Sequence, residues 1–480
     1  MTSLVPDAVD HYFRSRTDGS AGESAADRVR RHLDDARVRR RGEALVGVTA
    51  GEGGTVEILV VNDDMPMLVE AVLATVEAHD LTVDRMDHPV IPVQRDPDGT
   101  LVAVDSGETT PESWIAVCGL ARHPGIDPEP LRDDLREVVS RVIDVDADAS
   151  AMRSRMAECA AGMADAPLPG AGVSDADRGE YAALLEWFAG NHFHPLGHVR
   201  VGGDGPAGDA DRLGVWRTDS VSRDFPSVTD RPLVPRVSRV FVATGIQRTN
   251  FPVLVQVPTF DANGEHDGEH RFLGTLTSAG NHQAVLDVPV LRAKVHDVLA
   301  QAGVEEDSFA GQSMIELLQN YPLVEMFSST EDELERRLTE MLDAVATRSL
   351  RLFLRTNFDG RTAVALIYLP RDRYNTSTRL ALERALVAEV DGTRLEYTAR
   401  VSEMPLALLQ VLVCIDPTTA AELGSVDTGS PAHARVQAAL VAAIRGWDER
   451  VRELAVAEDI PALDGGPDVL LRQLSSLSED

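Results

Sequence analysis

Two short polar stretches hold the side chains most suited to binding a charged ligand. The first follows the apolar segment TVEILVV and consists of Asn62, Asp63, Asp64 and Met65. A strand is expected to end here and a helix to begin at Met67, so backbone N–H groups at the helix N-terminus are available to an amino-acid carboxylate. The stretch predicts an effector site, and the alternative is a turn that only caps the helix.

The second polar stretch follows the apolar strand AVALIYLP and consists of Arg371, Asp372, Arg373, Tyr374 and Asn375. Pro370 is expected to end that strand because it has no N–H to donate. Asn375 or Thr376 is expected to cap the helix that follows. Two interpretations stay open. The polar residues form caps and ion pairs within the turn, or they contact an effector or a neighbouring domain.

Other patterns that could carry chemistry lack the spacing or context they need. The alternating aspartates from Asp144 to Asp148 resemble a calcium loop without its required glycine and closing glutamate. The histidines of HFHPLGH (His192 to His198) lack a cysteine or acid to complete a metal site. Residues Gly203 to Gly208 spell GxGxxG, but a strand pattern follows instead of a helix. We therefore expect no metal, no cofactor bound by this chain and no catalytic residue.

Lysine usage restricts the possible chemistry further. Lys294 is the single lysine of the chain. Arginine stays protonated and forms no Schiff base, so chemistry that needs an active-site lysine depends on Lys294 or is absent. Lys294 lies in the amphipathic helical segment VLRAKVHDVL, where a solvated side chain is expected.

Composition restricts the partners and the compartment. The 480 residues carry 78 acidic and 46 basic side chains, and the net charge of −32 repels nucleic acid and anionic membranes. Three widely spaced cysteines favour a reducing compartment, and no apolar run is long enough to span a bilayer. We expect a cytoplasmic protein that binds neither nucleic acid nor membrane. The basic cluster between Arg28 and Arg41 is expected to dock on the protein itself.

Hydrophobic periodicity indicates two similar α/β regions separated by other elements. Residues 55–145 have the order βαβββα, which resembles a ferredoxin-like or ACT-type small-molecule sensor, although Met67 stands where that family usually has glycine. Residues 347–416 have the order ββαββ, with a tight turn at Asn357 to Gly360. Antiparallel strand patterns lie between these regions, followed by helices. Thr330 and Glu333 predict a capping box.

These patterns predict an α+β fold class: tandem ACT-like (ferredoxin-like) domains, a PAS-like antiparallel-sheet domain and helical segments between them. The expected boundaries are an N-terminal helical segment at 1–43, ACT-like domain 1 at 44–150, a linker at 151–179, the PAS-like domain at 180–285, a helical segment at 286–346, ACT-like domain 2 at 347–420, and a C-terminal helix with a polar tail at 421–480.

Several motifs resemble the N-terminal half of the very large bacterial NAD-specific glutamate dehydrogenases. They are NDDMPMLVEAV, RFLGTLTS with VPVLRAKV, NYPLVEMF with DEL, and LRLFLRTNFDGR followed by LPRDRYNTSTR. The resemblance covers about Val56 to Trp447, and its most specific part is Pro370 to Thr376. It implies ACT-like and PAS-like domains that serve assembly and allosteric response to amino acids, with the catalytic domain far downstream.

The family converts L-glutamate and NAD to 2-oxoglutarate and ammonia, in amino-acid catabolism. The resemblance implies a non-catalytic regulatory and assembly region, whose partner is a catalytic glutamate dehydrogenase domain in the same chain or in a separate one. A homo-oligomer and an amino-acid effector are also implied, and NAD belongs to the catalytic domain. The alternative is a stand-alone amino-acid-sensing regulator of the ACT type.

Overall fold

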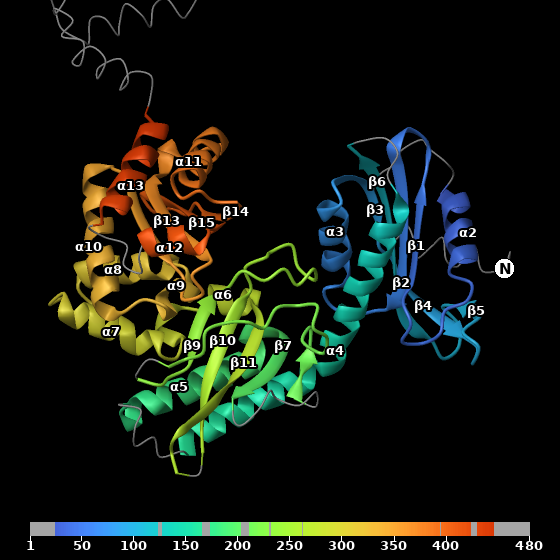
Figure 1. The fold of residues 1–480 in the computed structure, drawn as a ribbon, viewed down its shortest axis with the longest axis horizontal. Coiled ribbons are helices and arrows are strands. Elements are labelled where there is room, and N and C mark those ends of the chain that lie inside the picture. Colours follow the sequence, from blue (N-terminus) through green and yellow to red (C-terminus); the bar gives the residue numbers. More distant parts are fainter. Residues whose placement is uncertain are drawn as a thin grey trace, which may run out of the picture. The chain divides into compact units, whose positions relative to one another are not determined.

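The computed structural model describes residues 25–122, 127–165, 173–202, 211–229, 232–261, 263–393, 395–423 and 430–445. The chain divides into two compact units, Met1–Ala293 and Lys294–Asp480, and Figure 1 labels their helices and strands. Among the described helices, none is both long and apolar enough to cross a membrane. The predicted helical start of the 1–43 segment, the GxGxxG stretch and most of the polar tail lie outside the described residues.

The first unit begins with a six-stranded antiparallel sheet of order β1–β2–β6–β4–β5, in which β3 also pairs with β6. The elements are α2 (Ala25–Asp35), β1 (Leu45–Ala50), η1 (Glu52–Gly54), β2 (Thr55–Asp63), α3 (Leu68–Ala78), β3 (Leu81–Asp87), β4 (Val90–Arg95), β5 (Leu101–Val104) and β6 (Thr110–Ala121). The predicted order βαβββα has one strand too few, because the strand expected after α3 breaks at His88 and Pro89 into β3 and β4, which pair with different parts of β6.

Helices cover both faces of this sheet, because β2 and β6 are apolar on both sides. Leu59, Val61 and Trp114 pack against α2, in a core that includes Val29 and Leu33. The alternate residues of β2 point to the other face, where Figure 1 shows α3 and α4 side by side. Residues 62 and 63, at the end of β2, therefore point to opposite faces of the sheet.

A single long helix, α4 (Pro128–Asp165), replaces most of the structure predicted after residue 145. The linker expected at 151–179 is wrong for residues 151–165, and α5 (Asp175–Trp187) begins before the expected end of that linker. The helix continues past residue 145 because it buries a stripe of apolar residues at helical spacing, formed by Met152, Met156, Ala160 and Met163. The abundance of Ala, Asp and Gly in this region concealed that stripe.

The second sheet of the first unit is five-stranded, antiparallel and ordered β8–β7–β11–β10–β9. Its strands are β7 (Phe193–Gly202), β8 (Leu213–Gly214), β9 (Arg236–Arg239), β10 (Val253–Phe260) and β11 (His266–Leu276); the π-helical turn η2 (Phe188–His192) joins α5 to β7, and α6 (Ser278–His282) and η4 (Val285–Asp287) follow β11. The antiparallel sheet matches the prediction for this region, and its PAS-like character stays a prediction.

The second unit opens with helices, as expected for residues 286–346. They are α7 (Leu291–Gln301), which starts three residues before the unit boundary, α8 (Phe309–Asn320), α9 (Leu323–Phe327) and α10 (Glu331–Thr347). The predicted capping box of α10 is confirmed: the side chain of Thr330 accepts from the backbone N–H of Glu333, and the Glu333 carboxylate accepts from the backbone N–H of Thr330.

A four-stranded antiparallel sheet of order β12–β13–β15–β14 completes the second unit. Its elements are β12 (Arg351–Thr356), β13 (Thr362–Pro370), η5 (Arg371–Arg373), α11 (Thr376–Glu389), β14 (Leu395–Arg400), β15 (Leu406–Cys414), α12 (Pro417–Leu423) and α13 (Pro431–Ala443). The predicted domain end at residue 420 is too early, because Val436 and Leu440 of α13 are buried in the same core as Leu382 and Leu386 of α11.

The two α/β regions share one topology. In each, the central strand pair (β2 with β6, β13 with β15) is flanked by an edge strand that precedes it in sequence (β1 or β12) and by the strand after the first helix (β3 or β14). Helices follow both central strands. The mixture of helices and antiparallel sheets confirms the predicted α+β class.

Candidate functional site

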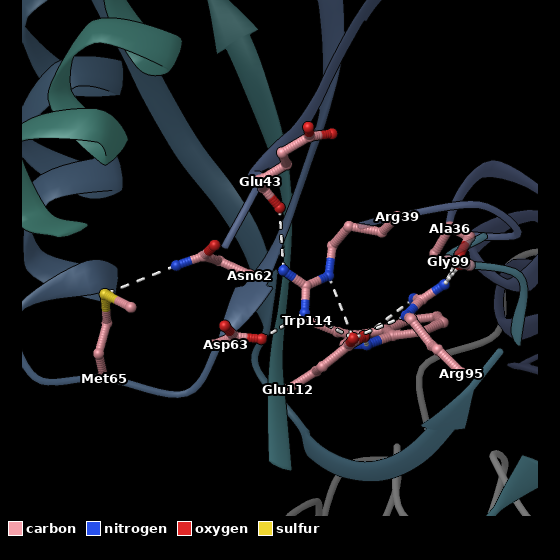
Figure 2. Close-up of polar contacts among 10 residues, drawn as sticks. All are labelled: Ala36, Arg39, Glu43, Asn62, Asp63, Met65, Arg95, Gly99, Glu112 and Trp114. Atoms are coloured by element: carbon pink, nitrogen blue, oxygen red, sulfur yellow. Dashed lines mark hydrogen bonds and ion pairs between the residues drawn. The ribbon is translucent and has the colours of Figure 1, made fainter. Parts of the chain in front are cut away.

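The predicted effector residues lie in the turn from β2 to α3, but their side chains diverge. Asn62 points to the α3 face and contacts Met65, with 3.5 Å between Nδ2 and the thioether sulfur (Figure 2). Asp63 points to the opposite face and binds Arg39. Asp64 accepts a hydrogen bond of 2.5 Å from the hydroxyl of Ser113. The four residues therefore share a turn without forming one cluster of side chains.

The backbone of this turn is strained at Met67. This residue is the N-cap of α3 and has φ 65°, the left-handed region that favours glycine. Its side chain makes no capping hydrogen bond, so the first N–H groups of α3 receive no cap from it. Met67 thus takes a backbone conformation that favours glycine, at an energetic cost.

Asn62 is the buried polar group of the turn. Its side chain is fully buried, and its Oδ1 has no hydrogen-bond partner among the described residues. A buried amide oxygen without a donor is costly, so such groups in native proteins call for an explanation. The contact of its Nδ2 with the Met65 sulfur is weak, because a thioether is a poor acceptor.

On the opposite face of the sheet, a buried charged cluster is centred on Glu112 (Figure 2). Arg95 donates to both carboxylate oxygens, at 2.7 and 2.9 Å, and Arg39 donates to Oε1 at 2.6 and 3.1 Å. The indole N–H of Trp114 donates to Oε2 at 3.1 Å. Arg39 also binds Asp63 at 2.5 Å. Two guanidinium groups therefore face two carboxylates.

This cluster stabilises the fold and is not suited to acid–base catalysis. Burial alone lowers the pKa of Arg39, but its hydrogen bonds and its attraction to Asp63 and Glu112 raise that pKa overall. Both oxygens of Glu112 already accept from strong donors, so this carboxylate has little capacity left as a general base. The cluster connects the segment that follows α2 with β2, β4 and β6. Sequence reasoning missed Glu112 and Arg95, although it predicted that the basic segment docks on the protein, as Arg39 does.

A cleft of about 620 Å³ opens beside the charged cluster. Arg39, Glu112 and Arg95 line its inner wall. Arg40 and Arg41 also line the cleft, and both are exposed. Neither of these two side chains forms an ion pair with another residue in the described part of the chain. The cleft is therefore lined by charges of both signs, because Asp96 and Glu108 also line it.

The corresponding turn of the second unit, from β13 to α11, is closed by local contacts. The backbone N–H of Arg371 donates to Pro405, and its guanidinium donates to the carbonyl of Ser402. Asp372 forms an ion pair with Arg348 across an exposed surface. Asn375 caps α11 by accepting from the backbone N–H of Thr378 at 2.9 Å, as predicted.

Tyr374 of the same turn is partly buried and packs against the core of this domain. Arg371, Asp372 and Arg373 are exposed. The capping interpretation thus has direct structural support. A contact of these exposed residues with an effector or another domain stays a prediction.

A second buried charged group lies on the other face of the β13–β15 sheet. Glu325 of α9 is fully buried and binds Arg355 of β12, with 3.0 Å between Nε and Oε2. Gln410 of β15 lies 3.5 Å from its other oxygen. Nearby, Arg337 donates to the hydroxyls of Tyr321 and Ser329 at 2.8 Å. In the second unit, a helix (α9) supplies the buried carboxylate that binds a strand arginine. In the first unit, the segment after α2 supplies Arg39, which binds the strand carboxylate of Glu112.

Lys294 is not solvated, contrary to the expectation from its amphipathic helix. Its side chain is 12% exposed, and its ammonium donates to the carbonyls of Ser329 at 2.6 Å and Met326 at 3.3 Å. Burial lowers the pKa of this ammonium, and the neighbouring acids Glu331 and Glu333 oppose that shift. The lysine therefore caps the C-terminal end of α9.

The histidines of the 192–198 segment take part in separate contacts. His192 hydrogen-bonds the carbonyl of Trp187 and stacks on its ring. His198 is buried and lies 2.9 Å from the ring nitrogen of His270. Asp144 and Asp148, from the apparent calcium loop, lie on α4 and bind Arg217.

Three models of glutamate dehydrogenase domains match this chain. The ACT1 domain matches residues 20–125, helical motif 1 matches residues 288–345, and the ACT2 domain matches residues 351–448. The ACT2 match includes α13, in agreement with the packing of that helix. The ACT1 match includes α2 and the charged cluster around Glu112.

Similar proteins cover most of the chain. An NAD-specific glutamate dehydrogenase of Mycobacterium tuberculosis is 29% identical over 94% of this chain and 29% of its own length. Proteins of the same name from Halomonas elongata and Pseudomonas aeruginosa are 29% and 24% identical, over 74% and 83% of this chain and 23% and 25% of their own lengths. The chain thus spans less than a third of each relative, and it belongs to the family of large NAD-specific glutamate dehydrogenases as the part that carries their ACT1, helical motif 1 and ACT2 domains.

Proposed function

We propose that this chain is a regulatory and assembly region of an NAD-dependent glutamate dehydrogenase and has no catalytic site of its own. In this proposal, oxidative deamination of L-glutamate takes place in a catalytic domain, in the same chain or in a separate one, which also binds NAD. The region acts in the cytoplasm, within a homo-oligomer.

The environment of Lys294 is the observation that carries the non-catalytic proposal. Glutamate dehydrogenase chemistry needs lysines that hold the substrate and stabilise the transition state that leads to the imine. The only lysine of this chain donates to the backbone carbonyls of Met326 in α9 and of Ser329 just after that helix, and its side chain is largely buried. A lysine held in this way has no free geometry for a substrate.

An activity assay tests this part of the proposal. The purified 480-residue chain is incubated with L-glutamate and NAD, and 2-oxoglutarate is measured by mass spectrometry. We expect no product above the level of a heat-denatured control. Product formation that scales with the concentration of the chain would contradict the proposal.

We further propose that the β2–α3 turn binds an α-amino acid as effector. Asn62 supplies a buried acceptor without a donor, which suits the ammonium group. The uncapped first turn of α3 supplies N–H groups and a positive helix end, which suit the carboxylate. In this proposal the Met65 side chain moves aside to expose Asn62, since its sulfur makes only a weak contact with the Asn62 amide.

A thermal-shift screen with the twenty amino acids tests the effector proposal. A ligand at about 100 times its Kd stabilises the folded state by roughly 2.7 kcal/mol, which is readily measured as a rise in Tm. Asn62→Leu should abolish the rise. The alternative, a stand-alone amino-acid regulator, also predicts this shift. A rate measurement separates the two hypotheses. As a regulatory region, the chain together with that amino acid should change the rate of a catalytic glutamate dehydrogenase domain, and as a stand-alone regulator it should not.

A further inference from the structure

The residue immediately before α7 has an unusual backbone conformation. Val290 has φ 70°, which lies in the left-handed region that favours glycine. It is the only β-branched residue among the described non-glycine residues with positive φ. A branched Cβ makes this region especially unfavourable, so such a residue stays there only when its surroundings hold it. The fold therefore stores conformational strain at the start of α7.

A carboxylate from another helix binds this strained residue. Glu180 of α5 accepts a hydrogen bond of 2.9 Å from the backbone N–H of Val290. The same carboxylate binds Arg292, with 2.6 Å between Nη2 and Oε1 and 3.0 Å between Nε and Oε2. The N–H groups at a helix start have no partner within the helix, and a negative charge beside them is favourable. Glu180 thus caps α7 from outside that helix.

The contact between Glu180 and α7 is still reached by solvent. The side chain of Glu180 is 24% exposed and that of Arg292 is 44% exposed, whereas Val288 and Leu291 beside the strained residue are fully buried. The hydrogen bonds of Arg292, assisted by the N–H of Val290, lower the pKa of Glu180 despite its partial burial. The carboxylate is therefore charged at neutral pH. Ion pairs that solvent reaches are weak, so strain at Val290 opposes a contact of modest strength.

The place of this contact in the chain gives it a consequence. α7 starts in the first unit and continues into the second, and the three residues of the contact all belong to the first unit. One helical turn after Val290, Lys294 donates to the backbone carbonyls of Met326 and Ser329, which belong to the second unit. α7 is therefore bound at its start by α5 and further along by the region of α9.

We propose that Glu180 and Val290 form a conformational latch on α7. In the latched state, the Glu180 carboxylate holds Val290 in its strained conformation, and the first turn of α7 is closed. In the released state, Val290 returns to negative φ, and this turn opens while the rest of each unit stays folded. The latch sets how firmly the start of α7 is joined to α5. It goes beyond the proposed function, because neither the latch nor its test involves an effector.

Hydrogen exchange of the full chain, measured by mass spectrometry over peptides that cover residues 288–296, tests the latch. Glu180→Ala removes the carboxylate, and exchange at the start of α7 should become about tenfold faster. Val290→Gly removes the strain, and exchange there should be as slow as in the unmodified chain or slower. Glu186→Ala is the matched control, because Glu186 is exposed on the same helix as Glu180, and it should leave this exchange unchanged.

The double variant Glu180→Ala with Val290→Gly separates a latch from an ordinary helix cap. If strain drives the opening, glycine should restore slow exchange even without the carboxylate, because opening then relieves no strain. An ordinary cap predicts the opposite result, since glycine makes the chain more flexible and should speed exchange further. The expected result is exchange close to that of the unmodified chain.

Any one of the following results would contradict the latch. Unchanged exchange in Glu180→Ala would show that the carboxylate does not hold α7, and faster exchange in Val290→Gly alone would show that Val290 is not strained. Exchange in the double variant that is as fast as in Glu180→Ala would identify a plain cap. Peptides of β7 and β13 report global stability, and equal acceleration there would show that Glu180 supports the whole fold instead of a local latch.

Discussion

The two ACT domains have the same strand order but differ at the turn that follows the first central strand. In ACT1, Met67 is strained, α3 has no side-chain cap, and the buried Oδ1 of Asn62 has no partner among the described residues. In ACT2, a 3₁₀ turn precedes α11, and the side chain of Asn375 caps that helix by accepting from the backbone N–H of Thr378. The start of α3 thus has no side-chain cap, whereas the start of α11 is capped from within its own domain.

The difference teaches that a shared topology does not imply a shared role. The opposite faces of the two sheets show the same contrast. In ACT1 the charged cluster around Glu112 borders an open cleft, whereas in ACT2 helical motif 1 supplies the buried Glu325 that binds Arg355. We interpret ACT1 as the domain that responds to a ligand and ACT2 as the domain that is fixed to its helical neighbours.

The largest expected effect comes from the two buried glutamates. Glu112→Ala leaves Arg39 and Arg95 without their shared carboxylate and should cost about 3–5 kcal/mol. Glu325→Ala leaves Arg355, whose side chain is 13% exposed, and should cost less, about 2–3 kcal/mol. Hydrogen exchange read separately over β6 and β13 measures each loss.

The control for this pair is Glu57→Ala, which removes an exposed ion pair with Arg31 and should cost under about 1 kcal/mol. An equal cost for Glu57→Ala and Glu112→Ala would show that the cluster around Glu112 is not the structural centre of ACT1.

A smaller effect distinguishes the two helix starts. Met67→Gly should stabilise ACT1 by about 1 kcal/mol, because glycine adopts φ 65° without strain. Asn375→Ala should destabilise ACT2 by about 1 kcal/mol, because it removes the cap of α11. Calorimetric Tm values of the two variants should therefore move in opposite directions. Stabilisation by both substitutions would contradict the account of ACT2, and destabilisation by both would contradict that of ACT1.

The smallest expected effect concerns the exposed part of the ACT2 turn. Asp372→Asn removes an ion pair with Arg348 in which both side chains are about two-thirds exposed. The cost to folding should be under about 0.5 kcal/mol, because solvent screens such pairs. A larger loss in Tm, or a change in the oligomer measured by sedimentation, would identify Asp372 as part of an interface.

Much of this fold was predictable from local sequence patterns. Most strands of both ACT domains, the Asn375 cap and the Thr330–Glu333 capping box follow from periodicity and short-range signals. The edge strand β1 was missed because Gly47 interrupts its apolar pattern. The course of α4 beyond residue 145 was missed because its buried methionines are separated by residues typical of loops.

The candidate site was less predictable, for a physical reason. The turn at Asn62 was located from the sequence, but alternate residues of a strand point to opposite faces, so Asn62 and Asp63 could not act together. Glu112 lies 73 residues from Arg39, and it lies beside Asp63 only through the register of β2 with β6. Such long-range pairings become visible only once strand pairing is known.

The central claim is that ACT1, and not ACT2, holds the effector turn. Its most direct test is the amino-acid thermal-shift screen carried out on the unmodified chain and on two variants, Asn375→Ala and Asn62→Leu. At least one amino acid should raise Tm equally in the unmodified chain and in Asn375→Ala, and the rise should be absent in Asn62→Leu. A rise that survives Asn62→Leu, or is lost with Asn375→Ala, would contradict the account.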